Sequence, residues 1–471
     1  MWPKLIANKL LRKRMGSDRF VADLQKTEAS NEVQSSSNSL FSETATSDQK
    51  ETQKYKLFVS TWNVGGVAPS DDLNLEEWLD TDNNPCDIYA LGFQEMVPLS
   101  AGNVLGSENS KIAMKWNSLI RAALNKTRKN WKKNLESKAG EKQKVYPVKD
   151  GDSKIVVPQD FKCIISKQMV GIFITVWVRG DLQRFVRHPS VSCVGCGIMG
   201  CLGNKGSVSI RFCLHETSFC FVCSHMASGG KIGDEIHRNS DAAGILARTS
   251  FPRGPSLDLP RKILDHDRVI WLGDLNYRIS IPAATTRSLV ERSEWDILLE
   301  NDQLRVELSE GRVFEGWHEG SIKFAPTYKY YPNSDNYYGC AQPKKGEKRR
   351  SPAWCDRILW YGKGLKQKEY SRGESGLSDH RPVRAVFNVE VEELRNSHPF
   401  QNFFLPDRFD RIVDHLELFS GQQFNCVFLP GADTEMLLVF PSFVLNKKKL
   451  KKKRENKNEE ENLNTEHADF D

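Results

Sequence analysis

Several strand-length apolar segments of this chain end in a polar side chain of a type that binds metal ions or phosphate. Four segments end in this way, and a fifth element places an Asp-His pair immediately before an apolar run. Because a sheet gathers its strand ends along one edge, these side chains can converge on a single site. The residues are Asn63, Glu95, His225, Asp274 with Asn276 two positions later, and Asp379 with His380.

This combination of side chains favours one kind of chemistry. Carboxylate and amide oxygens suit Mg²⁺, a hard cation that retains water and bridges to phosphate oxygens. Such an ion polarises a phosphoryl oxygen, a carboxylate orients or deprotonates water, and His and Asn side chains stabilise the oxygens as charge builds. A single acidic residue at a strand end is more often a cap or a turn former. The five elements together indicate metal-assisted phosphoryl chemistry.

The cysteines suggest an alternative metal site. Cys193 and Cys196, and again Cys220 and Cys223, have the spacing of zinc ligands. However, the second pair lies in an apolar run that we predict to be a strand, where residues three apart face opposite sides of the sheet. We therefore expect buried, small hydrophobic cysteines. The odd total of 11 cysteines indicates reduced thiols inside a cell.

Many strands and a few helices must position the polar residues. Runs rich in Val, Ile, Phe and Trp, bounded by Gly, Pro, Asn or Asp, recur from Tyr55 onward and are typical of strands. With helical windows between some of them, they indicate an α+β protein in which two sheets pack together and helices flank them. The predicted strands lie within 56–63, 87–95, 161–178, 207–214, 219–226, 268–278, 354–362 and 381–391, and the helices within 114–124, 234–248 and 284–299.

Composition divides the chain into four predicted parts. Residues 1–25 form a basic N-terminal segment, either a short helix or a solvated tail. Residues 26–54 are rich in Ser, Thr, Gln, Asn and Glu, so we predict a disordered linker. The strand-rich region 55–391 is the domain that carries the chemistry, and 392–471 is an atypical C-terminal extension.

The net charge of +6 comes from the two ends of the chain. Of 67 basic residues, five lie within 1–14 and seven within 447–454, and setting these twelve aside leaves 55 against 61 acidic residues. A mildly acidic body disfavours a protein that tracks a nucleic-acid backbone. The run 447–454 is interpreted as a solvated tail, a nuclear-localisation signal or a tether to anionic lipid. No apolar run approaches the ~20 residues that a membrane span requires.

Five short motifs resemble those of a known family. The motifs are STWN at 60–63, GFQE at 92–95, GDLNYR at 273–278, PAWCDRILW at 352–360 and SDHRPV at 378–383. With them the chain is similar to the inositol polyphosphate 5-phosphatases, which belong to the DNase-I-like metal phosphoesterases, over about residues 55–391, and its intervening stretches are similar to the plant type I branch. The resemblance implies a four-layer α/β/β/α sandwich.

The resemblance implies a metal-binding and water-activating group of residues. Asn63 and Glu95 would hold Mg²⁺ as the cofactor. Asp274 would orient or deprotonate the attacking water, and Asp379 would support the metal side of the site. The implied reaction is hydrolysis of a phosphate monoester by direct water attack, without a covalent enzyme intermediate.

A second implied group binds the phosphate that is removed. Asn276 would stabilise the phosphoryl oxygens, and His225 would hydrogen-bond the scissile phosphate. His380, kept protonated by Asp356, would bind the same phosphate as negative charge grows.

Other polar residues would read the remaining phosphates of the substrate. By resemblance, one loop pair contacts the 4-phosphate and the GNKG turn faces the 1-phosphate, while Arg238 and Asn239 support the site. Cys196 stands where the plant branch tends to have arginine, which we expect to weaken recognition on the 1-phosphate side. The 4-phosphate set is Tyr328, Lys329, Lys348 and Arg350, and the 1-phosphate set is Asn204 and Lys205.

The sequence therefore predicts an Mg²⁺-dependent 5-phosphatase of inositol polyphosphates, phosphoinositide lipids or both. The alternatives are a nuclease on the same scaffold and a catalytically weak phosphoinositide-binding protein. We expect a monomer that is cytoplasmic and peripheral at anionic membranes, without a nucleic-acid partner, and that enters the nucleus if 447–454 acts as a signal. Two apolar stretches, 101–106 and 198–202, are candidates for lipid contact, although we expect core packing for both.

Overall fold

A computed structural model of the chain describes residues 20–23, 50–81, 84–106, 110–126, 160–253, 259–338 and 350–394, and the backbone of 424–427 and 438–441. Contacts divide the chain into two units, Met1–Arg395 and Asn396–Asp471. The described part of the second unit is a pair of antiparallel strands that coincide with apolar pieces of the sequence. These strands are β13 (Phe424–Val427) and β14 (Leu438–Pro441).

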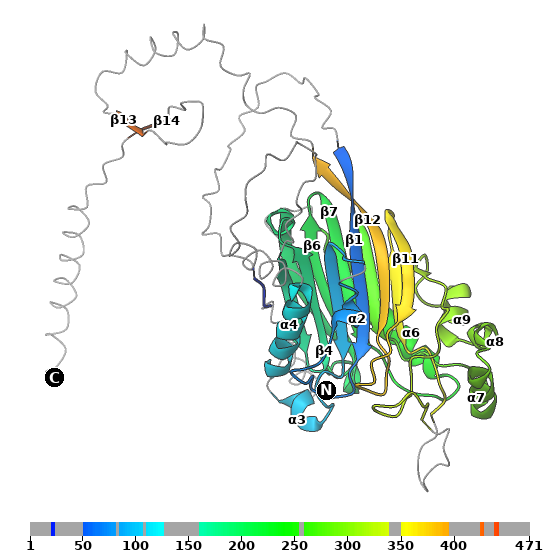
Figure 1. Cartoon of the computed structure of the whole chain (residues 1–471). Coiled ribbons are helices and arrows are strands. Elements are labelled where there is room, and N and C mark those ends of the chain that lie inside the picture. The colour runs from blue at the N-terminus through cyan, green and yellow to red at the C-terminus, as the bar shows by residue number, and fades with distance from the viewer. Residues whose placement is uncertain are drawn as a thin grey trace, which may run out of the picture. The chain divides into compact units, whose positions relative to one another are not determined.

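The first unit contains two six-stranded sheets (Figure 1). In the first sheet the order is β11-β12-β1-β2-β4-β3, and only the central pair β1–β2 is parallel. Its strands are β1 (Lys50–Asn63), β2 (Ile88–Gln94), β3 (Phe161–Met169), β4 (Ile172–Arg179), β11 (Leu365–Arg372) and β12 (Val383–Leu394).

The second sheet repeats this plan. Its order is β5-β6-β7-β8-β10-β9, and again one central pair, β7–β8, is parallel. Because parallel neighbours end at the same edge, each sheet brings two strand ends together at its middle. The strands are β5 (Val186–Gly195), β6 (Gly206–Leu214), β7 (Thr217–His225), β8 (Arg268–Asp274), β9 (His318–Glu319) and β10 (Asp356–Tyr361).

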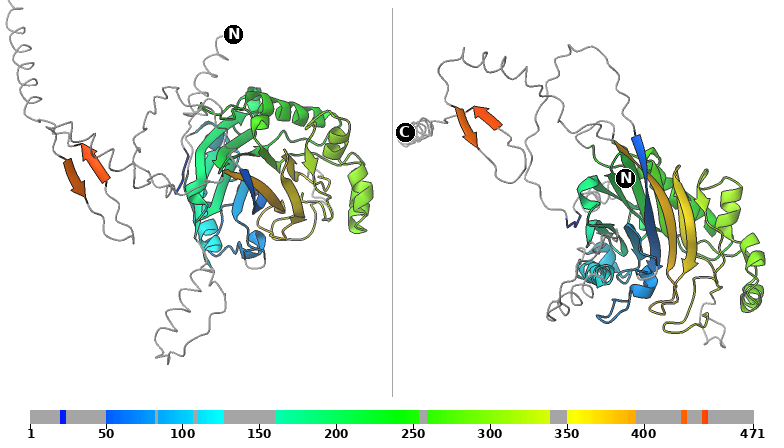
Figure 2. Two further views of the ribbon diagram at one scale, coloured as in Figure 1. Left: turned by 90° about the horizontal axis from the view of Figure 1, so that it is seen from above. Right: turned by 45° about the horizontal axis from the view of Figure 1, so that its top comes forward.

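Helices cover the outer face of each sheet (Figures 1 and 2). Trp78 of α2 and Trp116 of α4 pack on the first sheet, whereas Ile245 of α6 and Leu304 of α9 pack on the second. The helices are α2 (Glu76–Leu79), α3 (Ala101–Leu105), α4 (Lys111–Leu124), α6 (Asp234–Arg248), α7 (Ala283–Glu291), α8 (Trp295–Glu300) and α9 (Gln303–Ser309), with 3₁₀ turns η1 (Gln183–Phe185), η2 (Ile198–Gly200) and η3 (Ile263–Asp265). The predicted four-layer α/β/β/α sandwich of the DNase-I-like type is thereby confirmed. No helix in the described residues has the length and hydrophobicity to cross a membrane.

The main core lies between the two sheets, where alternate side chains of the strands meet. Phe221 and Cys223 of β7 point into this core, whereas Cys220 and Val222 point to the opposite, helix-covered face. Each large apolar side chain buried in this way contributes roughly 1.5–3 kcal/mol of stability. Cys220 and Cys223 therefore cannot share a metal ion, and the prediction of buried, hydrophobic cysteines is confirmed for this pair.

Several predicted boundaries are corrected by the strands. Strand β1 begins at Lys50, so residues 50–54 are not part of the linker, and β12 continues to Leu394, inside the predicted extension. The polar ends of the two strands pair in register, and cross-strand ion pairs join Lys50 to Glu392 and Lys54 to Glu390. Their polar composition conceals a strand because charge complementarity between the two strands replaces apolar packing.

Two predicted elements are each divided by a residue in the left-handed conformation. The apolar run 161–178 is a hairpin of β3 and β4, with Val170 at φ 54° in its turn. The window 284–299 is two helices, α7 and α8, separated at Ser293 with φ 57°. The hairpin turn contains Gly171, directly after Val170, and is therefore visible in the sequence, whereas the turn at Ser293 has no Gly, Asn or Asp to mark it. At the edge of β3, Val21 adds a short bridge to Ser166, so part of the N-terminal segment joins the sheet.

Candidate active site

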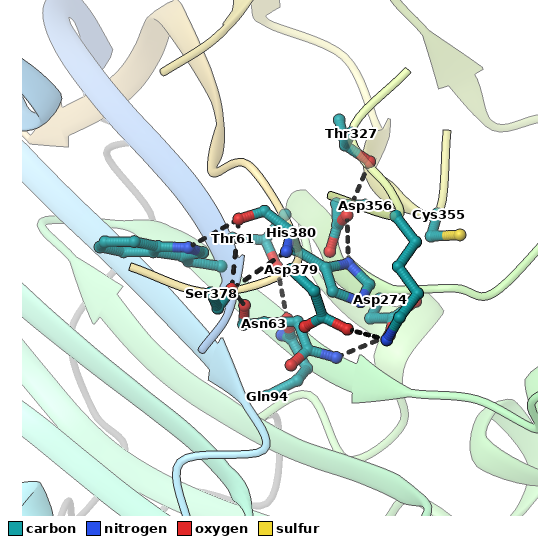
Figure 3. A network of polar contacts seen from close by, with 12 residues as sticks. Thr61, Asn63, Gln94, Asp274, Thr327, Cys355, Asp356, Ser378, Asp379 and His380 are labelled. Atoms are coloured by element: carbon teal, nitrogen blue, oxygen red, sulfur yellow. Dashed lines mark hydrogen bonds and ion pairs between the residues drawn. The ribbon is translucent and has the colours of Figure 1, made fainter. Parts of the chain in front are cut away.

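The four predicted strand-end residues meet where the centres of the two sheets face each other. Asn63 pairs in register with Gln94, the residue before Glu95, and His225 pairs with Asp274. Between the sheets, the Asn63 amide Nδ2 donates a hydrogen bond of 2.9 Å to Asp274 Oδ2. Figure 3 shows Asn63, Asp274 and His380 pointing toward one another from separate strands and loops.

Close packing of the sheets directly behind these strand ends depends on Gly92. A Cβ at this position would lie 2.7 Å from Leu272 Cδ1 and 2.8 Å from Cys223 Sγ. Both contacts are too short for a side chain, so only glycine allows β2 to approach β7 and β8 at this distance. The sequence GFQE thus places Glu95 next to the second sheet.

Asp274 is the most heavily contacted carboxylate of the site. Besides Asn63, its carboxylate lies 3.3 Å from His225 Nε2 and accepts a 3.1 Å hydrogen bond from the Asn276 main-chain N–H. Burial alone would raise the pKa of Asp274, but the His225 contact and the positive charges of His380 and Lys205 lower it below its ordinary value. Asp274 is therefore a carboxylate at neutral pH and can accept a proton or orient water.

His380 and Asp356 form a buried pair beside Asp274. His380 Nδ1 lies 2.8 Å from Asp356 Oδ2, which also accepts a 2.7 Å hydrogen bond from Thr327 Oγ1. Burial by itself would lower the pKa of His380, but the Asp356 carboxylate raises it to about 9. At neutral pH the imidazole is therefore a cation, held with its Nδ1–H toward Asp356. The other acceptor atom of that carboxylate, Asp356 Oδ1, is buried and has no hydrogen-bond partner among the described residues.

His225 is in the opposite protonation state. Its pKa is lowered, mainly by burial and further by the ammonium of Lys205, which contacts Nε2. Its other nitrogen, Nδ1, is buried, and no residue in the described part of the chain forms a hydrogen bond with it. The site thus contains one neutral and one charged imidazole. The two protonation states suit two different roles, because the neutral ring can hydrogen-bond a phosphate and the charged ring can stabilise the negative charge that develops on it.

Among the described residues, one cluster of titratable side chains has the geometry of a metal site. The ligand atoms of Asp274, Asp356 and His380 all lie within 4.8 Å of one another. His380 carries a proton and bonds to Asp356, so it is a poor ligand at neutral pH. Oxygen donors lie nearby: the partly exposed Glu95 carboxylate is 3.8 Å from His225 Nε2, and the Asn63 Oδ1 accepts a 3.0 Å hydrogen bond from the Gly65 N–H.

Asp379 does not lie with the buried carboxylates. Its Oδ2 accepts a 2.5 Å hydrogen bond from Lys329 Nζ, and the ion pair is about one quarter exposed. The charges of His380 and Lys329 lower the pKa of this carboxyl even though burial opposes the change. Asp379 and Lys329, predicted to act on the metal and on a substrate phosphate respectively, therefore neutralise each other in this structure.

The other predicted substrate-binding residues are divided between two places. Tyr328 packs against His380 with ring centroids 4.6 Å apart, and Arg350, near it, contributes a positive charge that acts on its hydroxyl. Lys205 lies deeper than expected, against His225, and within the part of the chain that the structure describes Asn204 Oδ1 is buried without a hydrogen-bond partner. Lys348 is outside the described residues.

Arg238 and Asn239 support the site without reaching it. The buried Arg238 donates to the Gly229 carbonyl and to Gln303 Oε1, and Asn239 Oδ1 accepts a 2.6 Å hydrogen bond from the Tyr277 hydroxyl. The bond to Gly229 holds the chain that follows His225, and the bond from Tyr277 holds the chain that follows Asp274.

The cysteine that replaces the expected arginine has an arginine beside it. Arg248 of α6 places its NH2 3.1 Å from Cys196 Sγ and donates from NH1 to the carbonyls of Gly195 and Gly200. Burial raises the pKa of the Cys196 thiol to about 11. The turn before the GNKG sequence is thus tied to α6 by a guanidinium from another element.

Three large apolar side chains are exposed on segments that follow strands at the edge of the sheets where the candidate site lies. Leu105 follows β2, Ile198 follows β5 and Ile232 follows β7, with exposed fractions of 55%, 64% and 103%. The expectation that 101–106 and 198–202 pack in the core is therefore wrong for Leu105 and Ile198, although Leu202 is buried.

The sequence analysis did not single out Arg278 and Gln303. Arg278 ends the GDLNYR motif, and its guanidinium donates to Asn276 Oδ1 at 2.6 Å and lies 4.5 Å from the Tyr328 ring centroid. The GDLNYR motif alone would have been enough to identify Arg278 as a candidate site residue from the sequence. Gln303 lies in a helix that looks unremarkable in sequence, and only tertiary contacts identify it.

Comparison with known proteins points to one family. Residues 60–386 match the family described as Endonuclease/Exonuclease/phosphatase family 2. The chain is 60% identical over 430 residues to Type IV inositol polyphosphate 5-phosphatase 9 of Arabidopsis thaliana, covering 88% of this chain and 98% of that protein. It is 52% identical over 347 residues to Type I inositol polyphosphate 5-phosphatase 8 of the same plant, covering 72% of each.

A solved structure supports the same conclusion. The inositol polyphosphate 5-phosphatase domain of SPsynaptojanin, in complex with inositol (1,4)-bisphosphate and a calcium ion, matches with a TM-score of 0.59 and 26% identity. The match covers 88% of this chain and 98% of that domain. The relatives carry both type I and type IV in their names, so they establish the family and not the type number.

Proposed function

The chain belongs to the inositol polyphosphate 5-phosphatase family and is a phosphatase, and on that basis we propose how its residues carry out the reaction. The proposal is Mg²⁺-dependent hydrolysis of the 5-phosphate by direct attack of water. The observation that carries it is the buried meeting point of Asn63, Asp274 and the charged His380. A carboxylate and an imidazolium whose polar atoms lie within 4.8 Å of each other are suited to activating water and to stabilising the charge that forms on phosphate.

The donor atoms at the site suit Mg²⁺. Glu95 offers a partly exposed carboxylate, and the amide Oδ1 of Asn63 has a lone pair beyond its hydrogen bond from Gly65. These are hard oxygen ligands without thiolates, which is the set that Mg²⁺ prefers. When bound, the ion would supply Lewis-acid polarisation of a phosphoryl oxygen. The calcium ion in the SPsynaptojanin domain is consistent with a divalent-cation site in this fold.

The protein groups divide the remaining work. Asp274, ionised and held by Asn63, orients the attacking water and accepts its proton. The neutral His225 and the amide of Asn276 hydrogen-bond the phosphoryl oxygens. His380, charged because Asp356 stabilises its proton, faces the same phosphate as negative charge develops.

We propose that the residues predicted to contact the 4-phosphate and the 1-phosphate select the substrate. Tyr328, Lys329, Lys348 and Arg350 would bind the 4-phosphate, and Asn204 with Lys205 the 1-phosphate. Binding of the 4-phosphate requires Lys329 to leave Asp379, because the side chains of Lys329 and Asp379 form an ion pair in this structure. A 4-phosphate would replace that carboxylate and release Asp379 toward the metal side of the site.

The substrates we propose are inositol 1,4,5-trisphosphate, inositol 1,3,4,5-tetrakisphosphate, and the lipids phosphatidylinositol 4,5-bisphosphate and 3,4,5-trisphosphate. The exposed Leu105, Ile198 and Ile232 on the catalytic edge support action at a membrane surface. We further propose a monomer that is cytoplasmic and peripheral at anionic membranes, with 447–454, outside the described residues, as a membrane or nuclear address.

One assay tests this proposal. Phosphate release is measured from inositol 1,4,5-trisphosphate, from phosphatidylinositol 4,5-bisphosphate in vesicles and, as a control, from the same mixtures with EDTA; cleavage of duplex DNA is measured in parallel. We expect release from at least one inositol substrate that needs Mg²⁺ and stops with EDTA. DNA cleavage without phosphate release would establish a nuclease, and vesicle binding without release would establish a binding protein.

A further inference from the structure

Gln303, far in sequence from the catalytic motifs, holds the chain that carries one of them. It is the first residue of α9 and is 8% exposed. Its main-chain N–H donates to the Arg278 carbonyl at 2.8 Å, and its side-chain Oε1 accepts from the Arg278 N–H at 2.8 Å. Both main-chain groups of Arg278 are thereby bonded to one residue.

The side chain of Gln303 is itself fixed by two further partners. Arg238 NH2 donates to the same Oε1 at 2.6 Å, and Gln303 Nε2 donates to Glu235 Oε2 at 3.0 Å. Both partners belong to α6. The amide orientation is determined, because Arg238 can only donate and Glu235 accepts.

The Arg278 guanidinium in turn fixes the orientation of the Asn276 side chain. Its NH2 donates to Asn276 Oδ1 at 2.6 Å and its Nε donates to the Asn276 carbonyl at 3.1 Å. A guanidinium has no acceptor, so the oxygen of the Asn276 amide must face it. The Asn276 Nδ2 then donates one hydrogen to the Met226 carbonyl at 3.1 Å and has a second hydrogen for another acceptor.

Arg278 also contacts the residue that packs on the charged histidine. Its guanidinium lies 4.5 Å from the Tyr328 ring centroid, within cation–π distance. His380 also packs on that ring, with centroids 4.6 Å apart, and Lys329 Nζ lies 5.6 Å from the ring centroid. Arg278 is thus positioned between Asn276 and Tyr328, two groups that face the proposed phosphate site.

We propose that Gln303 is a positioning residue for the hydrolysis: it clamps the Arg278 main chain so that the guanidinium orients the Asn276 amide toward phosphate and supports Tyr328. The inference rests on the function proposed above. Loss of the clamp lets Arg278 shift, and the Asn276 amide can then rotate. Because an error of about 1 Å in a catalytic group can cost 10²-fold in rate, the effect is on kcat rather than on substrate binding.

The test compares near-isosteric and exchanged variants in the full chain, with inositol 1,4,5-trisphosphate and Mg²⁺. Gln303→Met removes all three side-chain hydrogen bonds at similar volume, and we expect kcat to fall roughly 10- to 100-fold with KM changed less than about threefold. Glu235→Gln is the matched control: it removes a charge from the same cluster but leaves Gln303 Oε1 on Arg278, so kcat stays near the wild-type value. Exchange of the pair, Gln303→Glu with Glu235→Gln, keeps an acceptor for Arg278 and is expected to restore kcat.

A double-variant comparison separates positioning from simple stability. In an Arg278→Ala background, we expect Gln303→Met to lower kcat little further, although it lowers the free energy of unfolding by the same amount in both backgrounds. Equal fold losses of kcat in both backgrounds would overturn the proposal. So would an unchanged kcat in folded Gln303→Met.

Arg278→Lys is the replacement test if Gln303→Met does not fold. It removes the planar guanidinium that bonds to Asn276 and keeps the hydrogen bonds between Gln303 and the main chain of residue 278. Wild-type kcat in that variant would equally overturn the proposal. If the wild type itself releases no phosphate, the proposed function fails; if the wild type is active and these variants match it, only this inference fails.

Discussion

The site has a floor and a rim, and the two are built differently. The floor consists of Asn63, His225, Asp274, Asp356 and His380, each at most 4% exposed and set at or beside a strand end. The rim consists of Lys329, Arg350, Leu105, Ile198 and Ile232, which lie in segments between strands and are partly or largely exposed. Leu105 is the last residue of α3 and Ile198 the first of η2, and the other three lie on loops. A sheet register fixes the floor, whereas the rim can move with its loops.

This difference separates the chemistry from the choice of substrate. Floor residues have fixed partners and perturbed protonation states, which is what proton transfer and charge stabilisation require. Rim residues carry charge or apolar surface that a substrate or a membrane can compete for, as the Lys329–Asp379 pair illustrates. Floor variants should therefore change kcat, and rim variants should change KM or the preference between soluble and lipid substrates.

The largest effect is expected in the floor. Asp274→Ala removes the group proposed to accept the proton of water, and His380→Ala removes the cation facing the phosphate. Each should lower kcat by roughly 10²- to 10⁴-fold, measured by phosphate release at saturating substrate. Asp296→Asn, at an exposed position on α8, is the control and should keep wild-type activity. Activity within tenfold of the wild type in both floor variants would remove the distinction between floor and rim.

The pH dependence tests the charge on His380. Its pKa is raised to about 9 by Asp356, so activity should fall tenfold per pH unit above about 9. The stability that this pair contributes is complete below the ordinary histidine pKa of ~6.5 and is lost as pH rises through about 9. In Asp356→Asn both the rate profile and the unfolding profile should lose their alkaline step near 9. An unchanged alkaline limb in that variant would assign the step to another group.

A smaller effect is expected at the charged part of the rim. Lys329→Met should raise KM for inositol 1,4,5-trisphosphate roughly tenfold with kcat within about threefold, because one charge-assisted hydrogen bond to the 4-phosphate is lost. Lys323→Met, at an exposed lysine of the same segment, is the matched control. A fall in kcat without a change in KM would move Lys329 from the rim to the floor.

The smallest effect is expected at the apolar part of the rim. Ile232→Ser should lower turnover of phosphatidylinositol 4,5-bisphosphate in vesicles by roughly 3- to 10-fold, in line with the loss of one buried apolar side chain. Turnover of soluble inositol 1,4,5-trisphosphate should not change. Ile297→Ser, at a 43% exposed isoleucine on α8, is the control. Equal losses on both substrates would show that Ile232 has no membrane role.

The floor was largely predictable from sequence because its residues follow apolar strands directly. Asn63, His225 and Asp274 each end a run of alternating or continuous apolar residues, and strand ends meet at sheet edges. Their protonation was partly predictable as well: the pairing of His380 with Asp356 was expected from the motifs, and the raised pKa of His380 agrees with it.

The rim and the supporting contacts were not predictable in the same way. Exposure of Ile198 depends on how far a loop extends, and local composition does not encode that distance. The Lys329–Asp379 pair joins residues 50 positions apart, and the Gln303 clamp joins α9 to the loop after β8. The edge strand β11 was missed because its sequence, LKQKEYSR, is polar on both faces, as edge strands commonly are.

Identification of the product tests the central claim most directly. Inositol 1,4,5-trisphosphate is incubated with the wild type, Asp274→Ala and His380→Ala in Mg²⁺, and the bisphosphate isomers are separated. The floor described above predicts inositol 1,4-bisphosphate as the product of the wild type, and its loss by roughly 10²-fold or more in both variants. A different bisphosphate isomer, or inositol 1,4-bisphosphate formed at the wild-type rate by either variant, would contradict it.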